Sequence, residues 1–95
     1  MRTEKKAIRD VMYEKRFTQT ELAEKAGFKS QSNINAILNN TQKGVRFDNL
    51  FKIFQAMGCE IVIRNKDNPS QEWVIDSYSG EEKKTGSEYL DSLLN

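Results

Sequence analysis

The sequence contains no histidine, only one cysteine and only one proline among its 95 residues. The absence of histidine excludes imidazole-based catalytic triads and removes the usual nitrogen ligand of zinc sites. The single cysteine, Cys59, cannot form a disulfide within one chain or a thiolate metal cluster. We therefore expect a protein of a reducing, cytoplasmic setting that binds no metal and no cofactor.

Long hydrophobic stretches and glycine-rich loops are also missing. No apolar run approaches the roughly 20 residues that a membrane span needs. Residues 1–6 are mostly polar and lack the apolar segment of a signal peptide. The five glycines stand apart from one another, and the carboxylates are scattered among lysines, so neither a phosphate-binding loop nor an acid–base pair is evident. We expect no membrane contact and no enzyme activity.

The charge balance differs between the two parts of the chain. Residues 1–66 carry 13 basic and 7 acidic side chains, whereas residues 67–95 carry 2 basic and 7 acidic ones. A basic body followed by an acidic tail favours a polyanion as the partner of the body, although an ordinary mixed-charge surface would give the same counts. The charge counts alone therefore do not distinguish a polyanion-binding protein from one with an ordinary surface, and the predicted secondary structure is needed.

The spacing of apolar residues predicts a mainly α fold with four short helices in the first 58 residues. The expected helices begin at residues 3 or 4, 19, 31 and 47 or 48, and they end at residues 15, 25, 38 or 39, and 57. Thr18 and Glu21 have the spacing of a capping box, and Ser30 can cap the third helix. Gly27 follows the second helix, and Asn40 follows the third, where we expect it to adopt a positive φ.

The residue types change after residue 58. β-branched residues with alternating polarity predict a strand over Cys59–Arg64, and residues 72–77 predict a second strand after a polar turn. We expect the two strands to form a hairpin over residues 59–78, or the first strand to pair with its copy in a second chain. Residues 79–95 are expected to form a mobile acidic tail with a short terminal helix, which leaves residues 1–58 as one helical domain.

Residues 17–34 combine a capped helix, a glycine turn and a second helix that begins with small or amide side chains, which is the layout of a helix-turn-helix. Residues 18–27 follow the pattern Thr-Gln-x-Glu-Leu-Ala-x-Lys-Ala-Gly, and residues 48–58 follow Asp-x-Leu-x-x-Ile-x-x-Ala-Met-Gly. On these motifs the chain resembles the Cro/repressor-type (xenobiotic-response-element, XRE) helix-turn-helix regulators of bacteria and phages, over roughly residues 4–58. The resemblance implies a lambda-repressor-like four-helix domain that binds double-stranded DNA and regulates transcription.

Two positions depart from the pattern of that family. Asn40 stands where the family usually has glycine, and Val45-Arg46 stands where proline followed by serine or threonine often precedes the fourth helix. We therefore expect the fourth helix to lack its usual side-chain cap.

The third helix is expected to enter the major groove with its first exposed side chains at the base edges. The candidates for base contacts are Gln31, Ser32, Asn33, Asn35 and Ala36. The candidates for phosphate contacts surround this helix and are Gln19, Lys29, Asn40, Thr41, Lys43 and Arg46. The resemblance itself implies base contacts for Gln31, Ser32 and Ala36 and a phosphate contact for Gln19. Lys5, Lys6 and Arg9 of the first helix are expected to lie further from the DNA than these candidates.

One recognition helix reads few base pairs, so we expect a homodimer, acting as a repressor on two half-sites about one helical turn apart. The expected dimer surface lies on the hairpin, at Ile61, Ile63, Trp73 and Ile75, with the fourth helix as the other possibility. Two alternatives stay open. The chain could be an antitoxin-like protein whose residues 67–95 bind a second protein, or an interaction module that keeps the fold without binding DNA.

Overall fold

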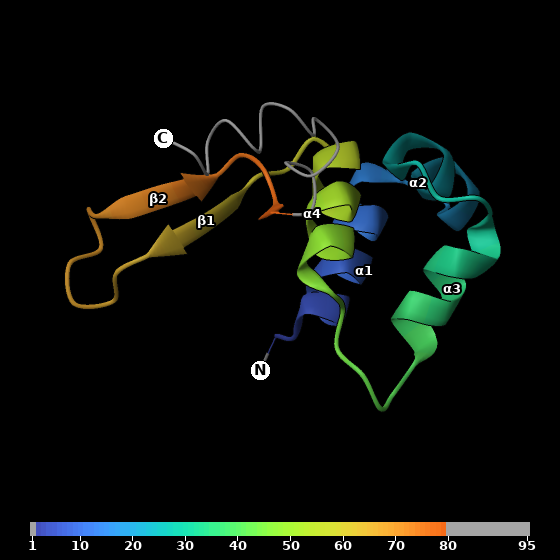
Figure 1. Cartoon of the computed structure of the whole chain (residues 1–95), viewed down its shortest axis with the longest axis horizontal. Helices are drawn as coiled ribbons and strands as arrows, with labels where there is room; N and C mark the ends of the chain where they lie inside the picture. Colours follow the sequence, from blue (N-terminus) through green and yellow to red (C-terminus); the bar gives the residue numbers. More distant parts are fainter. Residues whose placement is uncertain (1, 80–95) are drawn as a thin grey trace, which may run out of the picture. The chain divides into compact units, whose positions relative to one another are not determined.

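The computed structural model describes residues 2–79, and in these residues four helices precede two strands (Figure 1). The elements are α1 (Glu4–Lys15), α2 (Gln19–Ala26), α3 (Gln31–Asn39), α4 (Phe47–Ala56), β1 (Ile61–Arg64) and β2 (Glu72–Ile75). The expected mainly α fold with a hairpin after the helices is confirmed. The described residues divide into two compact units, with the boundary between Glu60 and Ile61. The expected terminal helix and tail lie outside the described residues.

Local side-chain chemistry sets the start of the first two helices. The Thr3 hydroxyl accepts a hydrogen bond from the backbone nitrogen of Lys6 at 3.2 Å and so caps α1. Thr18 and Glu21 form the predicted capping box: the Thr18 hydroxyl accepts from the Glu21 nitrogen at 3.1 Å, and the Glu21 carboxylate accepts from the Thr18 nitrogen at 3.3 Å. Gly27, with a φ of 82°, ends α2 in the left-handed conformation, as expected.

The end of α3 differs from the prediction. Asn40 has a φ of −76° and a ψ of 108°, so the expected positive φ at this residue is wrong. The chain leaves α3 in an extended conformation, and two side chains of α1 bind carbonyl oxygens at this end: Arg9 donates to Leu38 at 3.2 Å, and the Lys5 ammonium group donates to Asn40. Within residues 2–79, the non-glycine residue with a positive φ is instead Arg16, at 60°, immediately after α1.

α4 begins without a side-chain cap, as the Val45-Arg46 sequence predicts. Arg46 occupies the cap position and makes no side-chain capping bond. Its backbone carbonyl still accepts the first helical hydrogen bond, from the Leu50 nitrogen at 2.9 Å. Asp48 places a negative charge in the first turn, where the helix dipole favours it.

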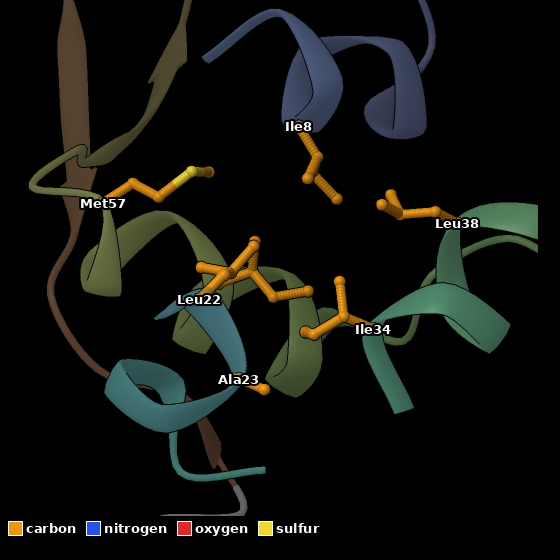
Figure 2. Close-up of a cluster of buried hydrophobic side chains, with 7 residues drawn as sticks. Ile8, Leu22, Ala23, Ile34, Leu38 and Met57 are labelled. Carbon is orange, nitrogen blue, oxygen red and sulfur yellow. The ribbon is translucent and has the colours of Figure 1, made fainter. Parts of the chain in front are cut away.

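The core of the helical unit draws on all four helices. Its buried members are Ile8, Leu22, Ala23, Ile34, Leu38, Ile53 and Met57. Figure 2 shows the labelled side chains pointing toward one another from their helices and from the end of α4. Burying each large side chain contributes roughly 1.5–3 kcal/mol. Ile34 and Leu38 thereby fix which side of α3 faces inward, and the opposite side is left exposed.

The hairpin is antiparallel and places four apolar residues on one face. The register pairs Ile61 with Ile75 and Ile63 with Trp73. Residues that lie directly opposite each other in an antiparallel pair project from the same face of the sheet. The four residues expected at the dimer surface therefore share one face, while the pair Val62 and Val74 projects from the other.

Both strands are shorter than predicted. β1 begins at Ile61 rather than Cys59, and β2 ends at Ile75 rather than at residue 77. The Cys59 backbone nitrogen donates to the carbonyl oxygen of Phe54 at 2.9 Å, so it belongs to the end of α4. The Cys59 side chain is partly buried against the helical core, where a free thiol packs as a small apolar group.

Candidate nucleic-acid interface

The outer side of α3 carries every residue expected to contact bases. These residues are all exposed and are Gln31, Ser32, Asn33, Asn35 and Ala36. They are exposed because the opposite side of the helix faces the core, where Ile34 and Leu38 are buried and Ile37 packs against them. In Figure 1 α3 lies at the edge of the helical unit, and α2 packs against it. The helix therefore presents one polar surface of amide, hydroxyl and methyl groups.

Gln31 at the start of α3 is bonded to Gln19 at the start of α2. The side-chain nitrogen of Gln31 donates to the side-chain oxygen of Gln19 at 2.8 Å. Because the Gln19 oxygen accepts this bond, its amide nitrogen is the end left to donate to an anion at the N-terminus of α2. Gln31 keeps its own carbonyl oxygen and its second N–H for another partner. The sequence predicts separate DNA contacts for these two residues but not the bond between them.

The first turn of α3 uses some of the predicted base-contacting side chains to hold the helix end. The Asn33 side-chain oxygen accepts from the backbone nitrogen of Ser30 at 3.1 Å. The hydroxyls of Ser30 and Ser32 lie 2.6 Å apart. Asn33 thus directs its acceptor toward the helix end, and its amide nitrogen is the group left for an outside partner.

Three side chains of α1 hold the segment that leaves α3. The Lys5 ammonium group donates to the carbonyl oxygens of Asn40 and, at 2.7 Å, Lys43. The Glu4 carboxylate accepts from the Val45 nitrogen at 3.3 Å. Arg9 binds Leu38 and Asn39 in the last turn of α3. The loop between α3 and α4 is therefore held by α1, in addition to its own bond from the Gln42 nitrogen to the Asn40 side-chain oxygen at 3.0 Å.

Arg9 begins a chain of hydrogen bonds that runs along α3 through Asn39 to Asn35. Its guanidinium donates to the Leu38 carbonyl oxygen at 3.2 Å and to the Asn39 side-chain oxygen at 2.9 Å. The Asn39 amide nitrogen then donates to the side-chain oxygen of Asn35 at 2.9 Å. Lys5 and Arg9, which were expected to lie further from the DNA, both contact the end of α3 or the loop after it. Their four-residue spacing puts them on one face of α1, but only the packing reveals what that face meets.

Four of the side chains expected to contact phosphates flank this surface. Lys29, Thr41, Lys43 and Arg46 are exposed. Lys43 and Arg46 border a hollow of about 210 Å³ between the end of α3, the loop and the first turn of α4. Arg46 lies 3.4 Å from Asp48, but its side chain is 81% exposed, so this ion pair holds it weakly. The group is therefore placed to donate to a polyanion that lies along α3.

The similarity to known proteins agrees with this geometry. Residues 6–64, more than half of the 95-residue chain, match the helix-turn-helix family. The chain belongs to the XRE-type helix-turn-helix family. This is a family of DNA-binding transcription regulators and is typically non-enzymatic. The expected family is confirmed, and the match runs past residue 58 to the end of β1. No curated protein and no solved structure matches the chain.

Metal-binding clusters and membrane-spanning helices are both absent from the described residues. Between residues 2 and 79, no group of three or more histidine, cysteine, aspartate or glutamate side chains could hold a metal ion. No helix in this range has the length and apolar character that crossing a membrane requires.

Proposed function

We propose that this helix-turn-helix protein is a sequence-specific transcriptional repressor whose α3 lies in the major groove of its operator. The observation that carries the proposal is the exposed polar side of α3, with Gln31 and Ser32 at its first turn. An α-helix fits the major groove, and glutamine can donate to and accept from a base edge there. Repression is the simplest outcome, because a protein that occupies an operator blocks access to that DNA.

Phosphate contacts would fix the register of α3 along the groove. Gln19 has its amide nitrogen at the N-terminus of α2, where backbone amides and the helix dipole favour an anion. The other candidates lie around α3 and are Lys29, Asn40, Thr41, Lys43 and Arg46. Such contacts carry no sequence information, so they would serve every duplex equally.

The apolar face of the hairpin supports a homodimer. Ile63 and Trp73 lie opposite each other, and each is 51% exposed. A two-stranded sheet with such a face is marginal in water unless something covers it. We propose that a second copy of the chain covers it, so that two α3 helices reach half-sites roughly 34–36 Å apart.

The same face leaves room for the antitoxin-like alternative. A second protein could cover Ile63 and Trp73 and also engage the acidic residues 67–95. Purification of the chain from its native source would then yield a complex of two different proteins rather than a homodimer.

Selection of bound duplexes from a random DNA pool tests the proposal. The full chain should enrich one sequence with two-fold symmetry, and footprinting of that sequence should protect two half-sites one helical turn apart. The Gln31→Ala variant should enrich a sequence with one relaxed base pair in each half-site. If the native chain enriches no sequence, the protein is not a sequence-specific regulator. An enriched single half-site would leave DNA recognition intact but contradict the homodimer.

A further inference from the structure

We propose that Arg9 and Asn39 fix the orientation of the Asn35 side chain, so that Asn35 offers a hydrogen-bond donor to the DNA and selects a base with an acceptor. Arg9 and Asn39 would be positioning residues, and Asn35 the one that meets the base. This inference rests on the proposed function, because it assumes that α3 lies in the major groove.

The direction of the chain of hydrogen bonds is set by Arg9. A guanidinium group has only N–H donors and no acceptor. The Asn39 side chain lies 2.9 Å from it and must therefore present its oxygen to Arg9. Arg9 also donates to the Leu38 carbonyl oxygen at 3.2 Å, at the C-terminal end of α3, where the helix dipole favours a cation. Its position therefore does not depend on Asn39 alone.

The orientation of Asn39 fixes that of Asn35 in turn. With its oxygen turned toward Arg9, Asn39 presents its amide nitrogen to Asn35 one helical turn earlier. The Asn35 oxygen accepts this bond at 2.9 Å. The amide nitrogen of Asn35 is then the end available to an outside partner, and the residue is exposed on the outer side of α3.

This polarity changes what Asn35 can recognise. A freely turning asparagine pairs with adenine through both ends, donating to N7 and accepting from the exocyclic N6. Asn35 already engages its oxygen with Asn39, so the two-ended pair with adenine is disfavoured. An amide donor alone suits the two adjacent acceptors N7 and O6 of guanine or the O4 atom of thymine. Adenine offers its single acceptor N7 beside the N6 donor, and cytosine offers only a donor in the major groove. We expect guanine or thymine opposite Asn35.

Reversal of the chain of hydrogen bonds is the sharpest test. In Asn39→Asp, one carboxylate oxygen can still accept from Arg9, and the other faces Asn35 with no proton to donate. Asn35 must then donate its amide to Asp at position 39 and turn its oxygen outward. The preferred base should change to one with a major-groove donor, which is adenine or cytosine. A residue that only stabilised α3 would change the affinity without changing the preferred base.

The experiment selects duplexes from a random pool with four versions of the full chain. The Asn35→Ala variant identifies the base pair under Asn35 as the one where preference is lost. At that pair, the native chain should favour guanine or thymine. Asn39→Asp should change the enrichment ratio of adenine or cytosine to guanine or thymine about tenfold in favour of adenine or cytosine. The matched control is Gln42→Glu, which makes the same amide-to-carboxylate change in the exposed loop beyond Asn40. It should lower affinity for all duplexes and leave the preferred base unchanged.

The outcomes separate this inference from the proposed function. If the native chain enriches no sequence, the proposed function fails and the inference fails with it. If the native chain enriches a sequence but Asn39→Asp keeps its preference, the inference alone is overturned. It is also overturned if Asn35→Ala relaxes no base pair, or if Gln42→Glu shifts the same base pair.

A second variant covers the case in which Asn39→Asp does not fold. Arg9→Met removes the donor that orients Asn39, so both asparagine amides become free to turn. The preference under Asn35 should then relax and admit adenine. In nuclear magnetic resonance spectra of the free protein, the side-chain amide signals of Asn35 and Asn39 should move in this variant. They should stay in place in Lys6→Met, which removes a cation that pairs with Asp10 instead. Unmoved Asn35 signals in Arg9→Met would contradict the inference without any DNA.

Discussion

The side chains of Gln31 and Gln19 are joined by a 2.8 Å hydrogen bond, although twelve residues and the turn between α2 and α3 separate them in the sequence. Gln31 is a candidate for reading a base, and Gln19 is a candidate for binding a phosphate. The bond means that each residue restricts the rotamers of the other before DNA arrives. In the proposed complex, holding one side chain in place lowers the entropy lost by the other on binding.

The first prediction is that Gln31 and Gln19 act as a pair. Gln31→Ala should cost about 1–3 kcal/mol of affinity for the selected operator and relax one base pair. Gln19→Ala should lower affinity for all sequences and also weaken the preference at that same pair, because Gln31 loses its partner. Fluorescence anisotropy on the operator and on its single-pair variants measures both effects. The double variant should lose less affinity than the sum of the two single losses, and strict additivity would contradict the coupling.

The second prediction concerns the cations next to the loop. Lys43→Ala and Arg46→Ala should each weaken binding to operator and random duplexes alike, because they remove phosphate contacts without removing sequence information. Each should also reduce the slope of log affinity against log salt by about 1. Lys66→Ala, in the turn between the strands, removes one charge outside the helical unit and is the control. A native affinity that does not change with salt would favour the protein-interaction alternative.

The features predicted correctly from the sequence depend on residues close together in the chain. Thr18, Glu21 and Gly27 define α2 through bonds that span at most a few residues. Alternation along a strand likewise assigns Ile61 and Ile63 to one face of the first strand and Trp73 and Ile75 to one face of the second, and the observed register brings these two faces together. Local geometry is enough to place such elements.

The features missed from the sequence depend on distant partners. Asn40 has no positive φ, and its carbonyl oxygen binds Lys5, 35 residues earlier. The orientation of Asn39 is fixed by Arg9, 30 residues earlier. No local pattern carries this information, since it arises only when α1 packs beside the end of α3. The positive φ at Arg16 was missed for another reason, because arginine is not a residue that favours the left-handed conformation.

The third prediction therefore concerns Arg16 and the stability of the helical unit. An L-residue in the left-handed conformation costs roughly 1–2 kcal/mol, and glycine avoids this cost but loses more chain entropy on folding. Arg16→Gly should raise the free energy of unfolding by about 0.5–1 kcal/mol in urea titrations followed by circular dichroism. Gly27→Ala is the opposite change at a similar helix end, with a φ of 82° and open space around the added methyl group. It should lower the free energy of unfolding by about 1 kcal/mol, and equal effects of the two changes would contradict the backbone explanation.

The fourth prediction concerns the apolar face of the hairpin, where two similarly exposed residues lie on opposite faces. Trp73 is 51% exposed on the face with Ile63, and Val74 is 52% exposed on the other. Trp73→Ala should raise the dissociation constant of the dimer by tenfold or more, since buried tryptophans at interfaces often contribute about 2 kcal/mol or more. Val74→Ala should leave it nearly unchanged. Sedimentation equilibrium of both variants at matched concentrations measures the effect.

The same interface should govern binding to the operator. Trp73→Ala should weaken operator binding steeply, because two half-sites are no longer engaged by one linked pair of helices. A chain that ends at Gly58 keeps every residue of the helical core and should sediment as a folded monomer with similarly weak binding. If this shortened chain or Trp73→Ala still sediments as a dimer, the hairpin face is not the interface. The exposed Phe47 on α4, whose ring lies 6.5 Å from that of Phe51, would then mark the next surface to mutate, by Phe47→Ala in the full chain.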